Sequence, residues 1–399
     1  MQPLNQRLKG GGMDEVYLDY NGSAPLDPRV AEAMLPELTS GIGNASSVHR
    51  FGLRRAAAVD KAREQVGALI GTRPSGVLFC SGATEANNLA LLGLAEAAPP
   101  ERNRIIISAT EHASVRKPSQ WLHTQGTAKV DVVGVTPGGY VNLDELEALL
   151  GPDVLVVSVM AANSETGVLN PVTQAAEHAH AVGAMLHCDA TQMVGRLPFN
   201  MTEVGADLVS LSSHKMCGPT GVGALVGTRS ALAQLSSIIH GGAHERGLRS
   251  GSLNVAGIVG LGSAAAICST ELHTEARAVS RLRDKLVAGL VEALAGDVSE
   301  NGDTSRRLPN TASIRFCGAD AEAVMHNMDP VAVSTGSACS SGAIEPSAVL
   351  LAMGLSRQAA FETVRFSLGR FTTEAEIQTA IQQAVTAVRY VRSMTEAPS

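Results

Sequence analysis

Lys215 is the residue whose type and position best suit covalent chemistry. It ends a polar turn that follows a predicted strand at 207–209, and it comes shortly before a glycine-rich segment at 218–223. A lysine in a partly desolvated pocket keeps some neutral amine, which can form a Schiff base with a carbonyl compound. Ser212 and His214 stand beside it and could bind a phosphate. The alternative is a solvated surface lysine, which this polar and glycine-rich context disfavours.

The segment 81–85, Ser-Gly-Ala-Thr-Glu, has the composition of an anion-binding turn. It lies between an apolar run and a helical stretch, so its amides point out of a helix N-terminus. Such amides, here around Ala83, bind phosphate, and the Thr84 hydroxyl adds a donor. An ordinary helix cap is the alternative, because Ser or Thr followed by Glu is also a capping pattern.

Asp189 and His112 each follow an apolar run and suit a ring-shaped cofactor. A carboxylate at the end of a buried strand is costly unless it meets a cation, such as a protonated pyridine nitrogen. The imidazole of His112 could stack on a ring or move protons near neutral pH. A helix-capping aspartate and a structural histidine are the respective alternatives.

Two further candidates, Cys339 and Arg365, lie far downstream in the sequence. Cys339 suits the role of a reactive thiol, and Arg365 suits the binding of an anion. Cys339 stands in a stretch of small residues at 334–342, where a loop could bring a reactive thiol to its target. Arg365 lies on a short apolar strand, and a grip on a substrate carboxylate would justify its position there. The alternatives are an inert loop cysteine and a strand-edge arginine that reaches solvent.

The elements that position these residues follow from the apolar pattern. Apolar runs that are continuous rather than alternating, separated by helical stretches, predict a mostly parallel sheet covered on both faces. Ligands bind beyond the carboxyl ends of such strands. The predicted strands are 77–80, 105–108, 154–160 and 185–188, with helices beginning at Thr84 and Ser114.

The pattern changes after residue 270 and predicts a smaller α+β domain. Its predicted elements are a charged amphipathic helix at 271–294, strands at 311–316, 331–334 and 363–367, and a final helix at 373–394. An apolar run at 253–268 is interrupted and too short for a membrane span, so it predicts a buried helix.

Composition narrows the class of protein. The chain has 399 residues, of which 45% are hydrophobic, so two domains are expected. The net charge of -7, with no basic run, makes nucleic acid and membrane poor candidates as partners. The six cysteines form no C-x-x-C pair, so no metal site within this chain is expected. Residues 1–12 lack the apolar stretch of a secretory signal, and Met13 is an alternative start, so a cytoplasmic protein is expected.

Together these segments resemble the group I cysteine desulfurases, which belong to the class V, fold-type I enzymes that use pyridoxal 5′-phosphate. The most specific pieces are Ser-Ser-His-Lys at 212–215, His-Gly-Gly-Ala-His-Glu-Arg-Gly-Leu-Arg-Ser-Gly at 240–251 and Gly-Ser-Ala-Cys at 336–339. The resemblance implies an α/β fold with a large domain built on a mostly parallel seven-stranded sheet, plus a smaller α+β C-terminal domain. The implied boundaries are an N-terminal segment at 1–26, the large domain at 27–270 and the small domain at 271–399.

The resemblance also implies roles for residues of the cofactor site. Lys215 holds the cofactor as a Schiff base, Asp189 pairs with the pyridine nitrogen and His112 stacks on the ring. The other implied cofactor contacts are Ala83, Thr84, Ser212 and His214 at the phosphate, Gln192 at the ring oxygen, Ser164 nearby, and Ser252 reaching the phosphate from a neighbouring subunit of a homodimer.

For the substrate, the resemblance implies L-cysteine, with Arg365 and Asn163 as its ligands. Lys215, with His112, would move the Cα proton, and the Cys339 thiolate would attack the substrate sulfur. L-Alanine would leave, and Cys339 would pass its persulfide to an acceptor protein such as an iron–sulfur scaffold. The resemblance also implies that Cys339 could be a transient iron–sulfur ligand, shared with the scaffold.

Two departures from the family pattern leave contacts open. Asn163-Ser164-Glu165 stands where Asn-Asn-Glu is usual, and 21–25, Asn-Gly-Ser-Ala-Pro, replaces an Ala-Thr-Thr-Pro pattern. The competing hypotheses are a selenocysteine lyase and another class V aminotransferase, lyase or epimerase in which Cys339 is incidental. A protein of this fold that only binds partners is a third.

Overall fold

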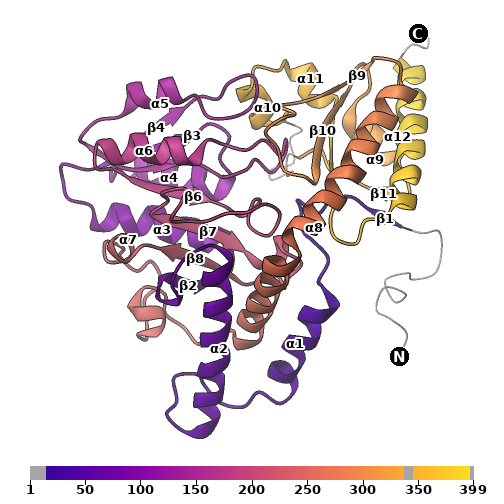
Figure 1. The fold of residues 1–399 in the computed structure, drawn as a ribbon. Helices are drawn as coiled ribbons and strands as arrows, with labels where there is room; N and C mark the ends of the chain where they lie inside the picture. Colours follow the sequence, from indigo (N-terminus) through magenta and orange to yellow (C-terminus); the bar gives the residue numbers. More distant parts are fainter. Residues whose placement is uncertain (1–14, 337–344, 396–399) are drawn as a thin grey trace.

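The centre of the fold is a seven-stranded sheet, seen in the computed structural model, which describes residues 15–336 and 345–395. In spatial order its strands are β2 Val77–Cys80, β8 Gly223–Gly227, β7 Leu208–Ser212, β6 Met185–Asp189, β5 Val154–Ser158, β3 Arg104–Ser108 and β4 Lys129–Val133. β8 runs antiparallel to β7 and β2, and the other neighbours are parallel. The predicted mostly parallel seven-stranded sheet is therefore confirmed (Figure 1).

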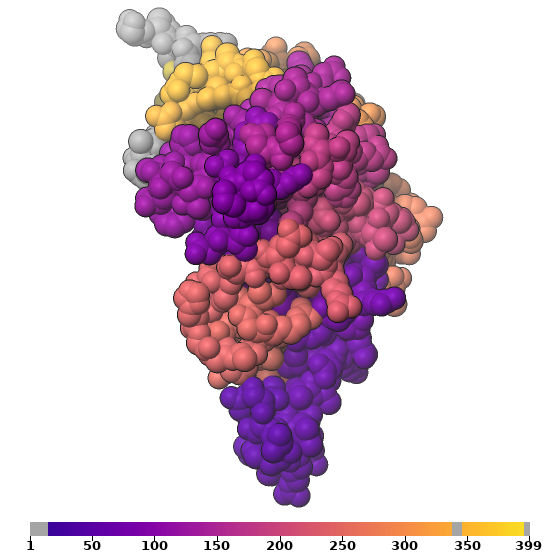
Figure 2. Space-filling model, turned by 90° about the vertical axis from the view of Figure 1, so that its left-hand side faces the viewer, coloured from indigo at the N-terminus to yellow at the C-terminus, as the bar shows by residue number. Residues whose placement is uncertain are grey.

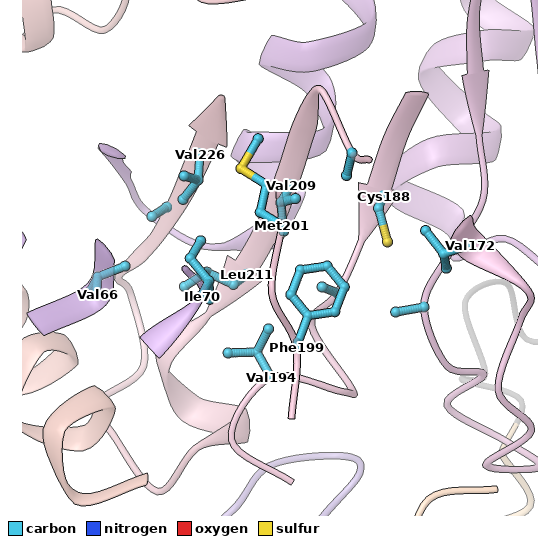
Figure 3. Packing of buried hydrophobic residues seen from close by; sticks show 14 of the residues in the cluster. Val66, Ile70, Val172, Cys188, Val194, Phe199, Met201, Val209, Leu211 and Val226 are labelled. Carbon is cyan, nitrogen blue, oxygen red and sulfur yellow. The ribbon is translucent and has the colours of Figure 1, made fainter. Parts of the chain in front are cut away.

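Helices cover both faces of this sheet (Figure 1). Side chains such as Leu78 and Ile105 pack against α3 and α4 on one face. The opposite face packs against α2, α6 and the first half of α8, and Figure 3 shows Val66, Val209 and Val226 meeting there. Burial on both faces explains why these strands read as continuous apolar runs. The helices are α2 Arg50–Leu69, α3 Ala83–Ala97, α4 Ala113–Thr124, α6 Val172–Ala181 and α8 Val255–Ala293.

A second core lies around a three-stranded antiparallel sheet, in which β10 pairs with both β9 and β12. Phe316 and Phe366 are fully buried in it and meet edge to face. The elements of this part are β1 Val16–Tyr17, β9 Val298–Glu300, β10 Thr311–Phe316, α9 Ala321–His326, β11 Val331–Ala332, α10 Ala348–Ala352, α11 Arg357–Phe361, β12 Thr363–Ser367 and α12 Glu374–Thr395. The N-terminal strand β1 pairs with β11, so the start of the chain packs on this core.

α8 is one continuous helix of 39 residues that belongs to both cores. The two helices predicted at 253–268 and 271–294 are therefore wrong as separate elements, because no cap or turn interrupts the chain between them. At the middle of α8, Glu275 pairs with Arg370 at 2.8 Å and Glu271 pairs with Arg29. Its most apolar stretch is long and apolar enough to cross a membrane, but 56% of that stretch is buried inside the protein, which is typical of a core helix.

The other predicted elements are present with small changes at their ends. The predicted strands at 154–160 and 331–334 are shorter, and end at Ser158 and Ala332. The division of the chain at residue 270 falls inside α8 and stays a proposal. The remaining elements are α1 Pro28–Thr39, α5 Leu143–Leu149, α7 Arg229–Leu232 and the short 3-10 turns η2 Pro74–Gly76, η3 Ser213–Lys215 and η4 His244–Gly247.

Candidate active site

The predicted site residues of the large sheet gather at one edge. β2, β3, β6 and β7 all point the same way, so their carboxyl ends meet there. His112 lies four residues after β3, Asp189 is the last residue of β6, and Ser212 is the last residue of β7. Lys215 follows within the single turn η3. The fold therefore brings together side chains that lie about a hundred residues apart in the sequence.

Lys215 has a half-buried amine that hydrogen-bonds to backbone carbonyls. Its Nζ donates to Asn21 O at 2.6 Å and to Gly22 O. Burial, together with the nearby charges of Arg196 and Arg365, lowers its pKa to about 8. Because a lower pKa leaves more neutral amine near neutral pH, Lys215 is suited to form a Schiff base and to accept protons.

A buried hydrogen-bond chain joins Asp189 to His112. Asn87 Nδ2 lies 2.8 Å from Asp189 Oδ2 and also 2.8 Å from Ser114 Oγ. Ser114 Oγ lies 2.7 Å from His112 Nδ1. Asn87 is fully buried, and Asp189 is 6% exposed. The chain therefore holds the carboxylate and the imidazole in a fixed relation to each other.

The contacts of His112 identify its tautomer. The backbone N–H of Ser114 donates to His112 Nδ1 at 3.1 Å. Because an N–H can only donate, Nδ1 must be the acceptor and the neutral ring carries its proton on Nε2. Glu111, the neighbour of His112, is 2% exposed, and its burial together with the charge of Asp189 raises its pKa well above the usual range. Burial and the charge of Asp189 therefore favour the protonated form of Glu111.

The N-terminus of α3 has free backbone donors for an anion. Its N-cap is Gly82, which has no side chain to satisfy the first amides. The backbone of Gly223 lies so close that a Cβ there would come within 2.7 Å of Gly82 Cα, while a Cβ on Gly82 would lie 3.8 Å from Ser212 Oγ. Thr84 lies in the first turn of α3, beside this cleft. Burial lowers the pKa of His214 to about 4, so this ring is neutral and can donate a hydrogen bond.

These groups fit a phosphorylated pyridine that carries an aldehyde. The amides at the start of α3 and the Ser212 hydroxyl suit the phosphate, and the Asp189 carboxylate suits a protonated ring nitrogen. Lys215 supplies the amine for the aldehyde. Thr84 and His112 line one open pocket of about 580 Å³ between α3 and α4.

Arg365 is held by the N-terminal segment of the chain. Its guanidinium pairs with Asp19 at 2.5 Å and donates to Ser164 O at 3.0 Å. Arg365 is 6% exposed, and its Nε has no partner among the described residues. Ser164 thus takes part through its backbone carbonyl, which also accepts a hydrogen bond from Asn21 Nδ2 at 3.0 Å.

Two other predicted ligands are committed to protein contacts. Gln192 Nε2 donates to Asn21 O at 3.1 Å, and its Oε1 accepts from Arg196. Asn163 Oδ1 accepts from the backbone amides of Glu165 and Thr166, so its side chain stabilises the turn after β5. Their roles as cofactor and substrate ligands stay predictions.

The segment 240–252 is anchored against the sheet. Glu245 is buried, pairs with Arg63 at 2.6 Å and accepts from the amide of Phe79. Glu245 and the next residue have φ of 44° and 60°, which is costly for residues with side chains and indicates a constrained turn. Ser252 follows this turn and is exposed, and its predicted role toward a second subunit stays a prediction.

Cys339 lies outside the described residues. Cys80 and Cys188 are buried, and burial raises the pKa of both thiols, so neither is a reactive cysteine. Sequence reasoning missed four residues that shape the site, namely Asp19, Asn87, Ser114 and Arg196. Asn87 and Ser114 could have been found near the start of the helices that follow two of the predicted strands, whereas Asp19 and Arg196 carried no such signal.

Comparisons with known proteins agree with this geometry. The aminotransferase class-V family matches residues 16–379. A cysteine desulfurase of Frankia sp. (strain EuIK1) is 43% identical over 389 residues, covering 96% of this chain and 93% of the relative. A cysteine desulfurase IscS of Anaeromyxobacter dehalogenans (strain 2CP-C) is 42% identical, covering 95% and 94%. The solved structure of a NifS-like protein has a TM-score of 0.88 at 34% identity, covering 94% of this chain and 100% of that chain.

Proposed function

The chain belongs to the aminotransferase class-V family and is a pyridoxal 5′-phosphate-dependent cysteine desulfurase, and we propose that it passes the sulfur of L-cysteine to Cys339. The observation that carries the activity is the similarity to cysteine desulfurases along almost the whole chain. The geometry supports this activity through three groups: the amine of Lys215, the carboxylate of Asp189 and the backbone amides at the start of α3.

The cofactor is proposed to lie across the carboxyl edge of the sheet. When bound, it stabilises negative charge on the substrate carbon that carries the amine. Asp189 would hold its ring nitrogen, and His112 would face its ring. The other proposed contacts are Ala83, Thr84, Ser212 and His214 at the phosphate, and Gln192 at the ring oxygen.

Lys215 and Arg365 are proposed to orient and deprotonate the substrate. Arg365 would bind the carboxylate of L-cysteine, using its guanidinium fork. Lys215 has a pKa of about 8, so a useful fraction of its amine is neutral near pH 7 and can take the proton from Cα. His112 has Nε2–H on its free side, so the neutral ring can donate there rather than accept.

Cys339 is proposed as the sulfur acceptor. Its thiolate forms an S–S bond with the substrate sulfur while the Cβ–S bond breaks. The electron pair of that bond stays on Cβ, which takes the proton of the substrate thiol and becomes the methyl group of L-alanine. Ser334 is paired with Arg365 through both backbone hydrogen bonds. Cys339 is five residues further on, and five residues span at most about 18 Å.

The proposed assembly is a homodimer in the cytoplasm that hands its persulfide to an acceptor such as an iron–sulfur scaffold. The exposure of Ser252 supports the proposed contact with a second subunit. Apolar side chains are also exposed on α1 and around the start of α2, at the indigo end of the molecule in Figure 2. Leu38 is 66% exposed and Val48 91% exposed, which would suit a protein contact.

A direct test measures L-alanine release and protein-bound persulfide with purified holoenzyme and L-cysteine. We expect both products in the parent, and neither in Cys339→Ser. Cys317→Ser is the matched control, because Cys317 is a partly exposed free thiol in the second core and has no proposed role. Unchanged persulfide formation in Cys339→Ser would remove Cys339 from the mechanism.

A further inference from the structure

Asp19 places a carboxylate where a carboxylate of the substrate is expected. It contacts Arg365 Nη2 at 2.5 Å, while Arg365 Nη1 is bound to Ser164 O. The Asp19 side chain is 26% exposed, so it has a path to water, whereas the Arg365 side chain is 7% exposed. A guanidinium offers its fork to one carboxylate at a time in a bidentate contact. Asp19 holds Nη2, so a bidentate contact of Arg365 with a substrate carboxylate through Nη2 would use the same donor.

Gly22 makes room for this contact. A Cβ at Gly22 would lie 2.3 Å from Asp19 Oδ2 and 2.9 Å from its Cγ. Gly22 is not among the described residues with positive φ, so an alanine there would meet chiefly the carboxylate of Asp19, with a further close contact of 3.2 Å to the Asp19 backbone oxygen. Aligned on Pro25, Gly22 stands where the family pattern has alanine. The departure at 21–25 is thereby connected to the pairing of Asp19 with Arg365.

We propose that Asp19 is an internal competitor for Arg365, so that the carboxylate of an amino-acid ligand binds only after displacing the Asp19 side chain. The inference rests on the proposed role of Arg365 as the carboxylate ligand. Displacement is an exchange of one anion for another on the same guanidinium, and no covalent bond changes. Nε of Arg365, which has no partner within residues 15–336 and 345–395, remains as a further donor that the incoming carboxylate can use.

The competitor lowers affinity by holding Arg365 in a state that cannot bind ligand. The apparent dissociation constant equals the intrinsic constant divided by the fraction of competent protein. If Asp19 occupies the guanidinium about nine-tenths of the time, removing its charge tightens binding about tenfold. A ligand without a carboxylate gains nothing, because it does not use Arg365.

The test is a titration of holoenzyme with L-alanine, followed through the absorbance of the bound cofactor. Asp19→Asn should lower the dissociation constant of L-alanine about tenfold. Ethylamine, which is L-alanine without its carboxylate, should bind parent and variant equally. Glu374→Gln is the control, since it removes an equal charge from the exposed pair with Lys285 and should change neither constant.

Gly22→Ala gives an independent route to the same state, because it pushes the Asp19 carboxylate off Arg365. It should also tighten L-alanine binding and leave ethylamine unchanged. If Asp19→Asn weakens L-alanine binding or leaves it unaltered, Asp19 orients the guanidinium instead and the inference is overturned. Arg365→Gln separates this failure from the other: if it leaves L-alanine binding intact, the assignment of Arg365 as carboxylate ligand is wrong.

Discussion

The two halves of the site are held in place by different means. The sheet edge carries Asp189, His112 and Lys215 on turns that directly follow buried strands. The opposite side is made by the segment Asp19–Gly22 and by Arg365, which are 346 residues apart at their contact. The first half is positioned by local chain direction, whereas the second exists only when both ends of the chain have docked.

This difference distinguishes the groups that carry out the reaction from the groups that control ligand binding. Groups of the sheet edge are fixed by buried bonds, such as the pair of 2.8 Å contacts made by Asn87. The segment around Asn21 instead covers Lys215 and Arg365 with backbone carbonyls and one carboxylate. Substitutions at the sheet edge should therefore change turnover, and substitutions in the segment should change ligand binding and the docking of the two cores.

Lys215→Ala is the substitution in the sheet edge with the largest expected effect on activity. Without this amine the sheet edge loses its proposed proton acceptor, and alanine formation should fall by at least about a thousandfold. Cofactor retention on gel filtration should fall as well, since the proposed covalent link to Lys215 is gone. Lys285→Ala, in an exposed ion pair of α8, should leave both unchanged. Residual turnover near the parent value would mean that another group moves the Cα proton.

Asn87→Ala tests the buried chain of the sheet edge. The substitution strips a donor from Asp189 and from Ser114, so His112 loses its fixed orientation. Turnover should fall by about thirtyfold, corresponding to about 2 kcal/mol for buried partners left unpaired. Steady-state kinetics should show this in kcat more than in KM. Asn327→Ala, at the exposed end of α9, serves as control, and an equal loss in both variants would contradict a role for the chain.

Asn21→Ala tests the other half of the site, which contains the segment Asp19–Gly22. The Asn21 amide donates to Ser164 O and to Thr311 Oγ1 at 2.9 Å and is 2% exposed. Its loss should lower the free energy of unfolding by about 2 kcal/mol, measured by denaturant titration. Because the sheet edge stays intact, kcat should remain within about threefold of the parent. A collapse of kcat with unchanged stability would place Asn21 in the chemistry.

The smallest expected effect concerns pH. The pKa of Lys215 is lowered to about 8, so the amine is mostly charged below pH 8 and mostly neutral above it. The rate of cofactor uptake by apoenzyme should therefore rise with pH and level off above about 8. Arg196→Met removes one charge that lowers this pKa, so the plateau should move to higher pH. Uptake at pH 7.5 should then be about threefold slower.

Arg229→Gln removes an equally charged but exposed arginine of α7 and should leave the pH profile of uptake unchanged. If the profile of Arg196→Met matches that of the parent, the depressed pKa of Lys215 comes from burial and from the charge of Arg365, without a contribution from Arg196.

The sheet edge could be predicted from sequence because strand and site are contiguous there. Continuous apolar runs located the strands, and the polar residues after them supplied Asp189, His112 and Lys215. The contact of Asp19 with Arg365 could not be predicted in this way, since no local pattern records which loop meets which strand across the fold. Arg196 was missed for a similar reason, because its effect on Lys215 depends on burial that only the packed structure reveals.

The continuity of α8 also has a mechanical consequence. A helix of 39 residues is about 58 Å long and resists bending, so α8 is a stiff connection between the two cores. One end lies beneath the sheet against α1 and α2, and the other carries the core that contains Arg365. A movement of one core relative to the other would therefore have to tilt or bend α8.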